Sequence, residues 1–136
     1  MPAFHKATTV NASPERAWQV VGDLEVMGRM AGASKVQVDG MTRVCTFANG
    51  AVLHEQITNY SAQERSYNYN IEGSPLPVRN NRGAFAIASE AGQTSIVWDA
   101  EFELIGASQT DTVSAMWHGA MDQVLQSIKP VIEAAA

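Results

Sequence analysis

The sequence predicts an α+β fold in which a curved antiparallel sheet of seven strands wraps around one long C-terminal helix. Three observations support this prediction. Apolar and polar residues alternate with a period of two between positions 34 and 104, a helical period follows between positions 113 and 132, and a short helical stretch separates the first strand from the other six. Because a helix is ~10 Å wide and strands lie ~4.8 Å apart, the sheet must curl to bring its apolar face against that helix.

The first strand and two short helices are expected at the N-terminus. Residues 4–11 are rich in Thr and Val and predict the strand. Ser13 is a suitable N-cap and Pro14 a suitable first helical residue, so a helix is expected to begin there. Gly22 is expected to end or kink that helix, and residues 23–29 predict a second short helix.

Six further strands are indicated by alternating residues and by the turns between them. The apolar or aromatic positions of these strands are Val36 and Val38; Cys45 and Phe47; Leu53 and Ile57; Tyr67, Tyr69 and Ile71; Phe85 and Ile87; and Ile96, Trp98, Ala100, Phe102 and Leu104. Asp39-Gly40, Asn49-Gly50 and Ala91-Gly92 are turn signals. Residues 73–77 contain two prolines, which do not fit a central strand, and they predict a loop.

The last helix carries the apolar stripe that must cover the sheet. Its apolar residues run from Val113 to Ile132 and recur over roughly six turns. One helix cannot contact the whole inner face of seven strands. An internal, ligand-sized cavity between the sheet and the C-terminal helix is therefore predicted.

Composition and charge narrow the classes of function. The 136 residues, 46% of them hydrophobic, suffice for a single domain spanning positions 1–136. The net charge is −5 and the Lys and Arg residues are scattered, which argues against a nucleic-acid partner. Cys45 is the only cysteine, which fits a reducing cytoplasm, and no apolar run reaches the ~18 residues of a membrane span. We expect a cytoplasmic monomer or homodimer.

Several short stretches, taken in order and spacing, carry a family resemblance over nearly the whole chain. They are Ala12-Ser13-Pro14-Glu15 with Trp18, Val21-Gly22-Asp23, Arg43, Gly50, Glu55, Arg65 with Tyr69, Ser74-Pro75-Leu76-Pro77-Val78, Val97-Trp98 with Phe102, and Gly119. On these residues the chain resembles the SRPBCC superfamily, whose helix-grip fold is shared by START lipid-transfer domains and birch-pollen-allergen-like proteins. Within it, the chain is most similar to the bacterial polyketide cyclase/dehydrase and lipid-transport group, and there to MxaD-like proteins.

The resemblance implies a helix-grip fold whose cavity takes a small hydrophobic or aromatic metabolite of lipid or polyketide type, with no cofactor. Two stretches depart from the family pattern. Residues 28–32 replace a common Trp-x-Pro sequence, and Asn80 and Asn81 stand where an aromatic residue often follows the Pro-Leu-Pro-Val loop. Both places lie near the expected cavity mouth, which indicates a ligand different from those of relatives.

Alternation also places one acidic and one basic residue, Glu55 and Arg43, on the inner face of the sheet. Charged groups near an apolar interior need partners. In one interpretation, Glu55, Tyr69 and Arg43 form a catalytic or ligand-orienting cluster in which Glu55 is a general acid or base and Tyr69 stabilises an enolate. In the other, Arg43 and Glu55 are a structural ion pair across the two arms of the Asn49-Gly50 hairpin.

Further candidates for ligand binding come from both the sheet and the last helix. They are Tyr67, Arg79, Asn81, Phe85, Trp98, Phe102, Met116, Gly119 and Ala120. Each of the aromatic residues and Met116 is better explained, taken singly, as ordinary core. Gly119 costs ~1 kcal/mol inside a helix, so it either leaves room for a ligand or permits close packing. The three histidines lack the spacing of a metal site, and no metal is expected.

Three functions remain open from the sequence. The first is the binding of a small hydrophobic ligand in the cavity. The second is a cofactor-independent enzyme of the cyclase or dehydratase type that uses Glu55, Tyr69 and Arg43. The third, implied by the MxaD-like resemblance, is an accessory role in one-carbon or redox metabolism through a protein surface.

Overall fold

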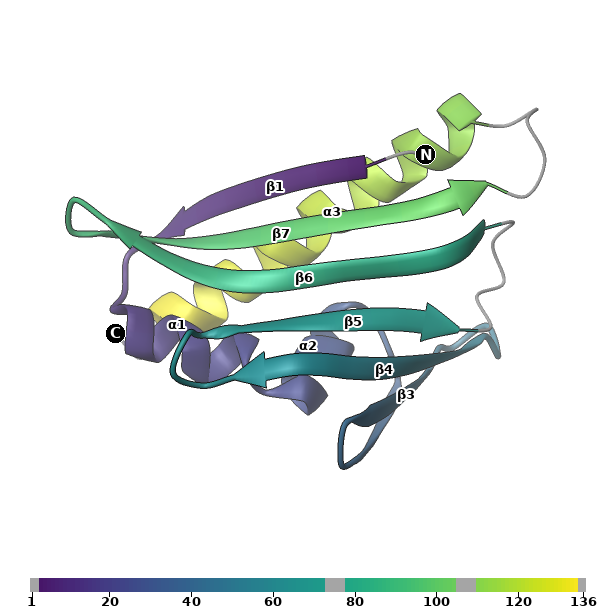
Figure 1. Cartoon of the computed structure of the whole chain (residues 1–136), viewed down its shortest axis with the longest axis horizontal. Helices are drawn as coiled ribbons and strands as arrows, with labels where there is room; N and C mark the ends of the chain where they lie inside the picture. Colours follow the sequence, from purple (N-terminus) through teal and green to yellow (C-terminus); the bar gives the residue numbers. More distant parts are fainter. Residues whose placement is uncertain (1–2, 73–77, 105–109, 135–136) are drawn as a thin grey trace.

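The computed structural model describes residues 3–72, 78–104 and 110–134. Its elements are β1 (Ala3–Val10), α1 (Pro14–Val21), α2 (Leu24–Met30), β2 (Lys35–Asp39), β3 (Thr42–Thr46), β4 (Val52–Ser61), β5 (Ser66–Glu72), β6 (Val78–Glu90), β7 (Gln93–Leu104) and α3 (Thr110–Glu133). The strands form one antiparallel sheet in the order β1-β7-β6-β5-β4-β3-β2, and α3 lies behind it (Figure 1). The predicted fold class is confirmed, while the loop predicted at 73–77 lies outside the described residues.

The two N-terminal helices begin where the sequence predicts them. The Ser13 hydroxyl accepts a hydrogen bond from the Arg16 amide at 3.1 Å, and Pro14 occupies the first turn of α1. Gly22 is the C-cap of α1, and the Asp23 carboxylate then caps α2. The two short helices therefore follow one another directly and lie against one end of the sheet (Figure 1).

The turns between the strands also occur as predicted. Gly40 and Gly50 have positive φ angles, as the Asp-Gly and Asn-Gly signals require. Ala91 and Gly92 both have positive φ, at 53° and 79°, which is the backbone of a tight hairpin turn. The Asn49-Gly50 hairpin fixes the β3–β4 register, so that Arg43 lies directly opposite Glu55.

Two hydrophobic clusters lie between the sheet and α3. The larger packs the two short helices and the C-terminal half of α3 against β4, β5, β6 and β7, and its fully buried members include Val21, Ile57, Tyr67, Ile96, Ile128 and Ile132. The smaller cluster joins β1 and β7 to the first half of α3 through Phe4, Phe102, Val113 and Met121. Trp98 packs against both clusters, which places it at the boundary between them.

The C-terminal end of α3 is held by α1. The Arg16 side chain donates hydrogen bonds to the carbonyls of Ile132 and Val131, at 3.1 and 2.9 Å. These carbonyls belong to the last turn of α3, where backbone acceptors lack partners within the helix. In the described part of the chain, no helix combines the length and apolar character needed to cross a membrane.

Arg79 and Asn81, both expected to bind the ligand from the inner face of the sheet, do not share that face, so the prediction for Arg79 is wrong. The register of β6 on β7 shifts just after Arg79, and Asn80 there has a φ of 51°. An extra residue in one strand of a pair reverses the faces on which the preceding side chains point. Val78 is therefore buried instead, and the exposed Arg79 forms an ion pair with Glu103 at 3.0 Å.

The prediction that Met116 lines an apolar pocket is also wrong. The buried stripe of α3 runs through Val113, Met121 and Ile128, and helical geometry turns position 116 away from it. Met116 is 53% exposed, and Gly119 and Ala120 are exposed as well. A Cβ on Gly119 would meet nothing within 4 Å, so this glycine does not serve close packing against the sheet.

Candidate functional site

An internal cavity of about 110 Å³ lies between α2, α3 and the inner face of the sheet. It is lined by Met27, Gly28, Ala31, Arg43, Cys45, Phe47, Leu53, Glu55, Tyr69, Ile71, Phe85, Trp98 and Val124. Most of these side chains are apolar. Leu53, Ile71 and Trp98 belong to the lining but are only half-buried, so the cavity is not sealed from solvent.

The Arg43–Glu55 ion pair supplies the charged groups of the cavity. Arg43 Nε donates a hydrogen bond to Glu55 Oε2, and Arg43 Nη1 donates a second to the Leu24 carbonyl at 2.9 Å. The two residues are 4% and 8% exposed. The pair joins β3 to β4 and, through Leu24, fixes the start of α2 above the sheet. The structural ion pair expected from the hairpin is therefore present.

Burial and the Glu55 charge shift the pKa values of Arg43 and of its neighbour Cys45. Burial acts to lower the pKa of Arg43, but the Glu55 charge and hydrogen bond outweigh it and raise the pKa above its ordinary value. Burial and the Glu55 charge raise the pKa of Cys45 to about 11, and its Sγ lies 3.9 Å from Glu55 Oε2. Cys45 is therefore a neutral thiol at physiological pH and a poor nucleophile.

Tyr67 and Asn81 are buried polar side chains on the inner face. Burial raises the pKa of Tyr67 to about 12, an effect that the nearby Arg43 guanidinium partly offsets. Within the described residues, the Tyr67 hydroxyl and Asn81 Oδ1 are buried without a hydrogen-bond partner. Such groups are rare in folded proteins and each requires an explanation.

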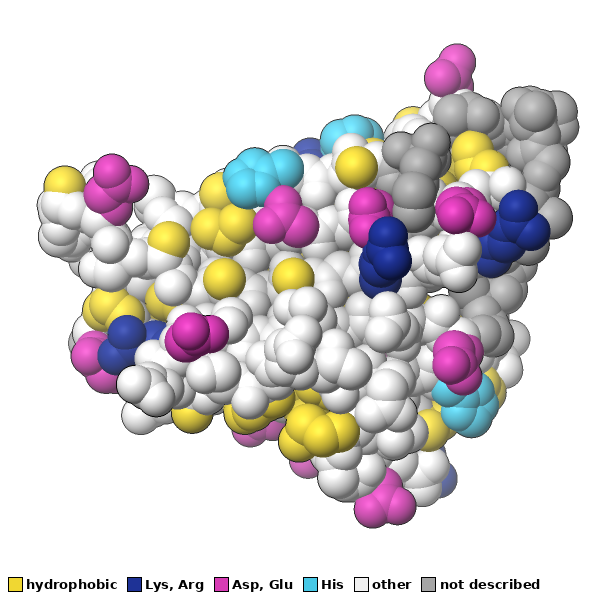
Figure 2. Space-filling model, viewed as in Figure 1, with side chains coloured by type: hydrophobic (Ala, Val, Ile, Leu, Met, Phe, Trp, Pro, Cys, Tyr) yellow, Lys and Arg dark blue, Asp and Glu magenta, His cyan; other side chains and the backbone are white. Residues whose placement is uncertain are grey.

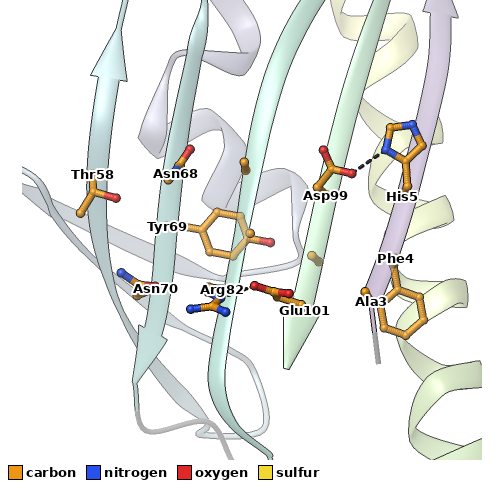
Figure 3. A pocket seen from close by; sticks show the side chains of 13 residues that line it. Ala3, Phe4, His5, Thr58, Asn68, Tyr69, Asn70, Arg82, Asp99 and Glu101 are labelled. Carbon is orange, nitrogen blue, oxygen red and sulfur yellow. Dashed lines mark hydrogen bonds and ion pairs between the residues drawn. The ribbon is translucent and has the colours of Figure 1, made fainter. Parts of the chain in front are cut away.

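Tyr69 and Trp98 form the second polar contact in the cavity wall. The Trp98 indole N–H donates a hydrogen bond to the Tyr69 hydroxyl at 2.8 Å. The Tyr69 ring reaches from β5 toward β6 (Figure 3), where its partner in the register is Gly83. Burial raises the pKa of Tyr69, although the Trp98 hydrogen bond acts in the opposite direction. The hydroxyl is thus protonated at physiological pH.

The structure brings together only part of the residue set proposed from the sequence. Glu55, Tyr69, Arg43, Phe85 and Trp98 line the cavity. Tyr67 lies behind Arg43, and Asn81 is buried but does not appear in the lining. Phe102 is buried in the smaller hydrophobic cluster instead of the cavity, and Arg79, Met116, Gly119 and Ala120 are exposed outside it.

Residues 28–32, expected near the cavity mouth, contribute Gly28 and Ala31 to the lining, next to Met27 of α2. Sequence reasoning did not single out Val124 of α3, which lines the cavity from the opposite helix. Close packing explains the glycine at position 28, because a Cβ there would lie 2.9 Å from a methyl carbon of Val36. Leu53 and Ile71, by contrast, could have been found from their alternation with Glu55 and Tyr69.

The outer face of the sheet carries a wider, shallow depression of about 600 Å³. Figure 2 shows this face as largely uncharged, with a few charged side chains over β1, β6 and β7. Figure 3 shows that polar side chains there already have partners, His5 with Asp99 and Arg82 with Glu101. Ligand sites are usually concave and bury most of the ligand surface, which a shallow depression does not. The inner cavity is therefore the better candidate site.

In the described part of the chain, no three His, Cys, Asp or Glu side chains gather closely enough to hold a metal ion. The carboxylate of Glu55 is already engaged by Arg43. The chemistry available at the cavity is that of a buried carboxylate, a guanidinium and a tyrosine hydroxyl among apolar side chains.

Solved structures share this fold at low sequence identity. The protein XoxI from Bacillus cereus matches with a TM-score of 0.84 and 20% identity, covering 97% of this chain and 96% of that one. A START superfamily protein from Mycobacterium smegmatis matches with a TM-score of 0.82 and 12% identity, covering 98% and 99%. A Thalictrum norcoclaurine synthase matches with a TM-score of 0.74 and 14% identity, covering 96% and 93%. These similarities show the fold alone.

A search of curated proteins finds no match. The family described as polyketide cyclase/dehydrase and lipid transport matches residues 1–133, nearly the full length of the chain. This match agrees with the resemblance drawn from the sequence motifs and with the helix-grip arrangement of sheet and helix. The chain belongs to the polyketide cyclase/dehydrase and lipid transport family.

Proposed function

We propose that the protein binds a small hydrophobic or aromatic metabolite in the inner cavity. The observation that carries the proposal is the cavity itself, about 110 Å³ in volume, apolar in most of its lining but containing a buried ion pair. Ligand pockets typically combine mainly apolar walls with a few polar groups that fix orientation.

Glu55 supplies the acceptor that would orient such a ligand. The hydrogen bonds that reach Glu55 from Arg43 and Cys45 both end at Oε2. Oε1 receives none from the described residues, and Glu55 lines the cavity. A ligand hydroxyl can therefore donate to Oε1, and a hydrogen bond to a carboxylate is about twice as strong as one between neutral groups.

The apolar side of the cavity would receive the body of the ligand. Phe85 and Trp98 stack on one another, with ring centroids 4.6 Å apart, and present an aromatic wall. Val124 and Met27 face them from the two helices. Burial of apolar ligand surface contributes roughly 25 cal/mol per Å², so these walls supply affinity while Glu55 supplies orientation.

Two probes of equal size, phenol and toluene, test the proposal. Phenol carries the O–H that Glu55 Oε1 would accept, and toluene does not. The wild-type protein should bind phenol at least tenfold more tightly than toluene, measured by amide-resolved NMR titration. A variant with Arg43→Met and Glu55→Leu should lose this preference, because the Glu55 acceptor is gone and the apolar part of the lining remains.

The matched control changes an ion pair on the outer face. Arg79→Met with Glu103→Leu removes an exposed pair outside the cavity and should leave both affinities unchanged. Shifts confined to surface residues, or equal binding of the probes by the wild-type protein, would contradict the proposal. Native mass spectrometry of the protein as purified would identify a physiological ligand directly.

The same residues separate carrying from catalysis once a natural ligand is known. Glu55→Gln and Tyr69→Phe should change the affinity of a carried ligand only a few-fold, because several contacts share the anchoring. If the ligand is instead converted, these substitutions should lower the rate by ~10²-fold or more, as the loss of a general acid or base does. That outcome would replace the carrier proposal with an enzymatic function.

A further inference from the structure

We infer that Trp98 limits the ligand to a single ring, and that Tyr69 and Gly83 position its indole for this role. The inference rests on the proposed function, since it concerns ligand size at the same cavity. The carbon skeleton that fits is a monocyclic aromatic molecule with a hydroxyl group directed at Glu55. Fused bicyclic ligands are excluded by the Trp98 indole.

Trp98 forms the wall between the cavity and the rest of the interior. It is the β7 residue in the cavity lining, and it packs against both hydrophobic clusters. Beyond it on the same face of β7 lie the small Ala100 and then Phe102 of the second cluster. Removing the indole would therefore extend the cavity along the sheet toward Phe102.

Two contacts hold the indole across the cavity. Its ring stacks on Phe85 with an interplanar angle of 27°, and its N–H donates to the Tyr69 hydroxyl at 2.8 Å. These contacts involve one face and one edge of the indole, and they fix its position and direction. The wall is consequently rigid, unlike a flexible side chain that moves aside for a larger ligand.

Gly83 makes the contact with Tyr69 possible. A Cβ at this position would overlap the Tyr69 hydroxyl and lie 2.7 Å from the Asp99 carbonyl oxygen. Any larger residue would push the tyrosine away from the position in which it receives the Trp98 N–H. The glycine is therefore explained by close approach of a ring, because its φ is not positive.

The cavity volume sets the size limit. At about 110 Å³ it is close to, and below, the ~150 Å³ of an engineered apolar cavity that accommodates benzene. One ring with a hydroxyl fits after small adjustments of the half-buried Leu53 and Ile71. A second fused ring has no space unless Trp98 is removed.

Phenol and 2-naphthol are the probes that test the inference. Both carry one hydroxyl, and they differ by one fused ring. The wild-type protein should bind 2-naphthol at least tenfold more weakly than phenol, and Trp98→Ala should reverse this order. Trp98→Leu keeps more of the packing and should show the same reversal to a smaller extent if Trp98→Ala folds poorly. Trp117→Ala is the control, since Trp117 packs against Phe102 in the smaller cluster and does not line the cavity.

The possible results distinguish this inference from the proposed function. Equal binding of phenol and 2-naphthol by the wild-type protein would overturn the size limit and leave the binding function standing. If the Trp98 variants bind 2-naphthol but the wild-type protein binds neither probe, Trp98 closes off the space as inferred, and the proposal that the native cavity binds a ligand is overturned. Failure of every variant to bind either probe would overturn both.

Tyr69→Phe tests the positioning part separately. It removes the acceptor of the Trp98 N–H and leaves the ring that covers Gly83. The exchange of the indole proton with solvent, followed by NMR, should become at least tenfold faster, and discrimination against 2-naphthol should weaken. Unchanged indole exchange would show that Tyr69 does not hold Trp98.

Discussion

Replacing Glu55 by Gln removes the charge that balances Arg43 while keeping the size of the side chain. The two side chains are 8% and 5% exposed, so water cannot solvate the guanidinium that remains. Breaking a buried ion pair in this way costs about 3–5 kcal/mol, which is a large part of the stability of an ordinary domain. The exposed pair Arg79–Glu103 offers the comparison, and Glu103→Gln should lower stability far less than Glu55→Gln, because water solvates the Arg79 that remains.

The double variant Arg43→Met, Glu55→Leu should recover most of the lost stability. Both charges are then absent, and apolar side chains of similar volume occupy a buried site, an exchange that is often neutral or stabilising. Only the Leu24 carbonyl loses a donor, which costs about 1–3 kcal/mol. The double-mutant cycle built with Arg43→Met should therefore show a coupling energy of a few kcal/mol between the two residues.

Urea denaturation followed by tryptophan fluorescence and far-UV circular dichroism measures these differences. If the free energy of unfolding falls with urea concentration at the same slope in every variant, the variants unfold from similar native states. A cost for Glu55→Gln as small as that of Glu103→Gln would refute the view that the pair lies in a low-dielectric interior. Recovery of stability in the double variant, together with loss of the preference for phenol over toluene, would indicate that the pair is kept for the ligand.

Three further predictions concern the fold around the site. Arg16→Ala should lower the free energy of unfolding by about 1.5–3 kcal/mol, because two carbonyls of α3 lose a charged donor. The control Arg29→Ala breaks an exposed i,i+4 pair and should lower the free energy of unfolding by less than about 0.5 kcal/mol in the same urea experiment. Ala91→Asn should raise stability by up to about 1 kcal/mol, because Asn tolerates the left-handed backbone and Asn-Gly is the preferred pair in this turn; no gain in melting temperature would contradict the turn assignment. The pKa of Cys45 is raised from 9.0 to about 11, so the neutral thiol stabilises the fold below pH 9, and this contribution is lost as the pH rises through about 11. Cys45→Ala should therefore flatten the decline of melting temperature between pH 9 and 11. Parallel curves of melting temperature against pH for the variant and the wild-type protein would refute the assignment.

The order of elements and the core of the polar site could be predicted from the sequence because both depend on local geometry. A period of two fixes which residues share a face, and the Asn49-Gly50 turn fixes how β3 pairs with β4. Together these two local rules place Arg43 opposite Glu55 on the buried side. Helix caps at Ser13 and Asp23 are local in the same sense.

The same alternation rule gave wrong results where one extra residue in a strand changed the face on which the side chains point. The bulge in β6 turned Arg79 outward, and a local sign of it is Asn80, a residue type that tolerates the left-handed backbone found there. On α3, the apolar pattern is broad enough to include Met116, and only packing against the sheet selects which part of it is buried.

The sequence by itself determined the fold class, the family, and the pairing of one buried acid with one buried base. The tertiary structure decided that α2 covers this pair, that Tyr69 passes Gly83 to reach Trp98, and that the remaining space is about 110 Å³. The physical reason is that alternation and turn geometry act over a few residues. A cavity, in contrast, is the difference between large volumes contributed by segments far apart in the chain, and such a difference is fixed only when those segments pack.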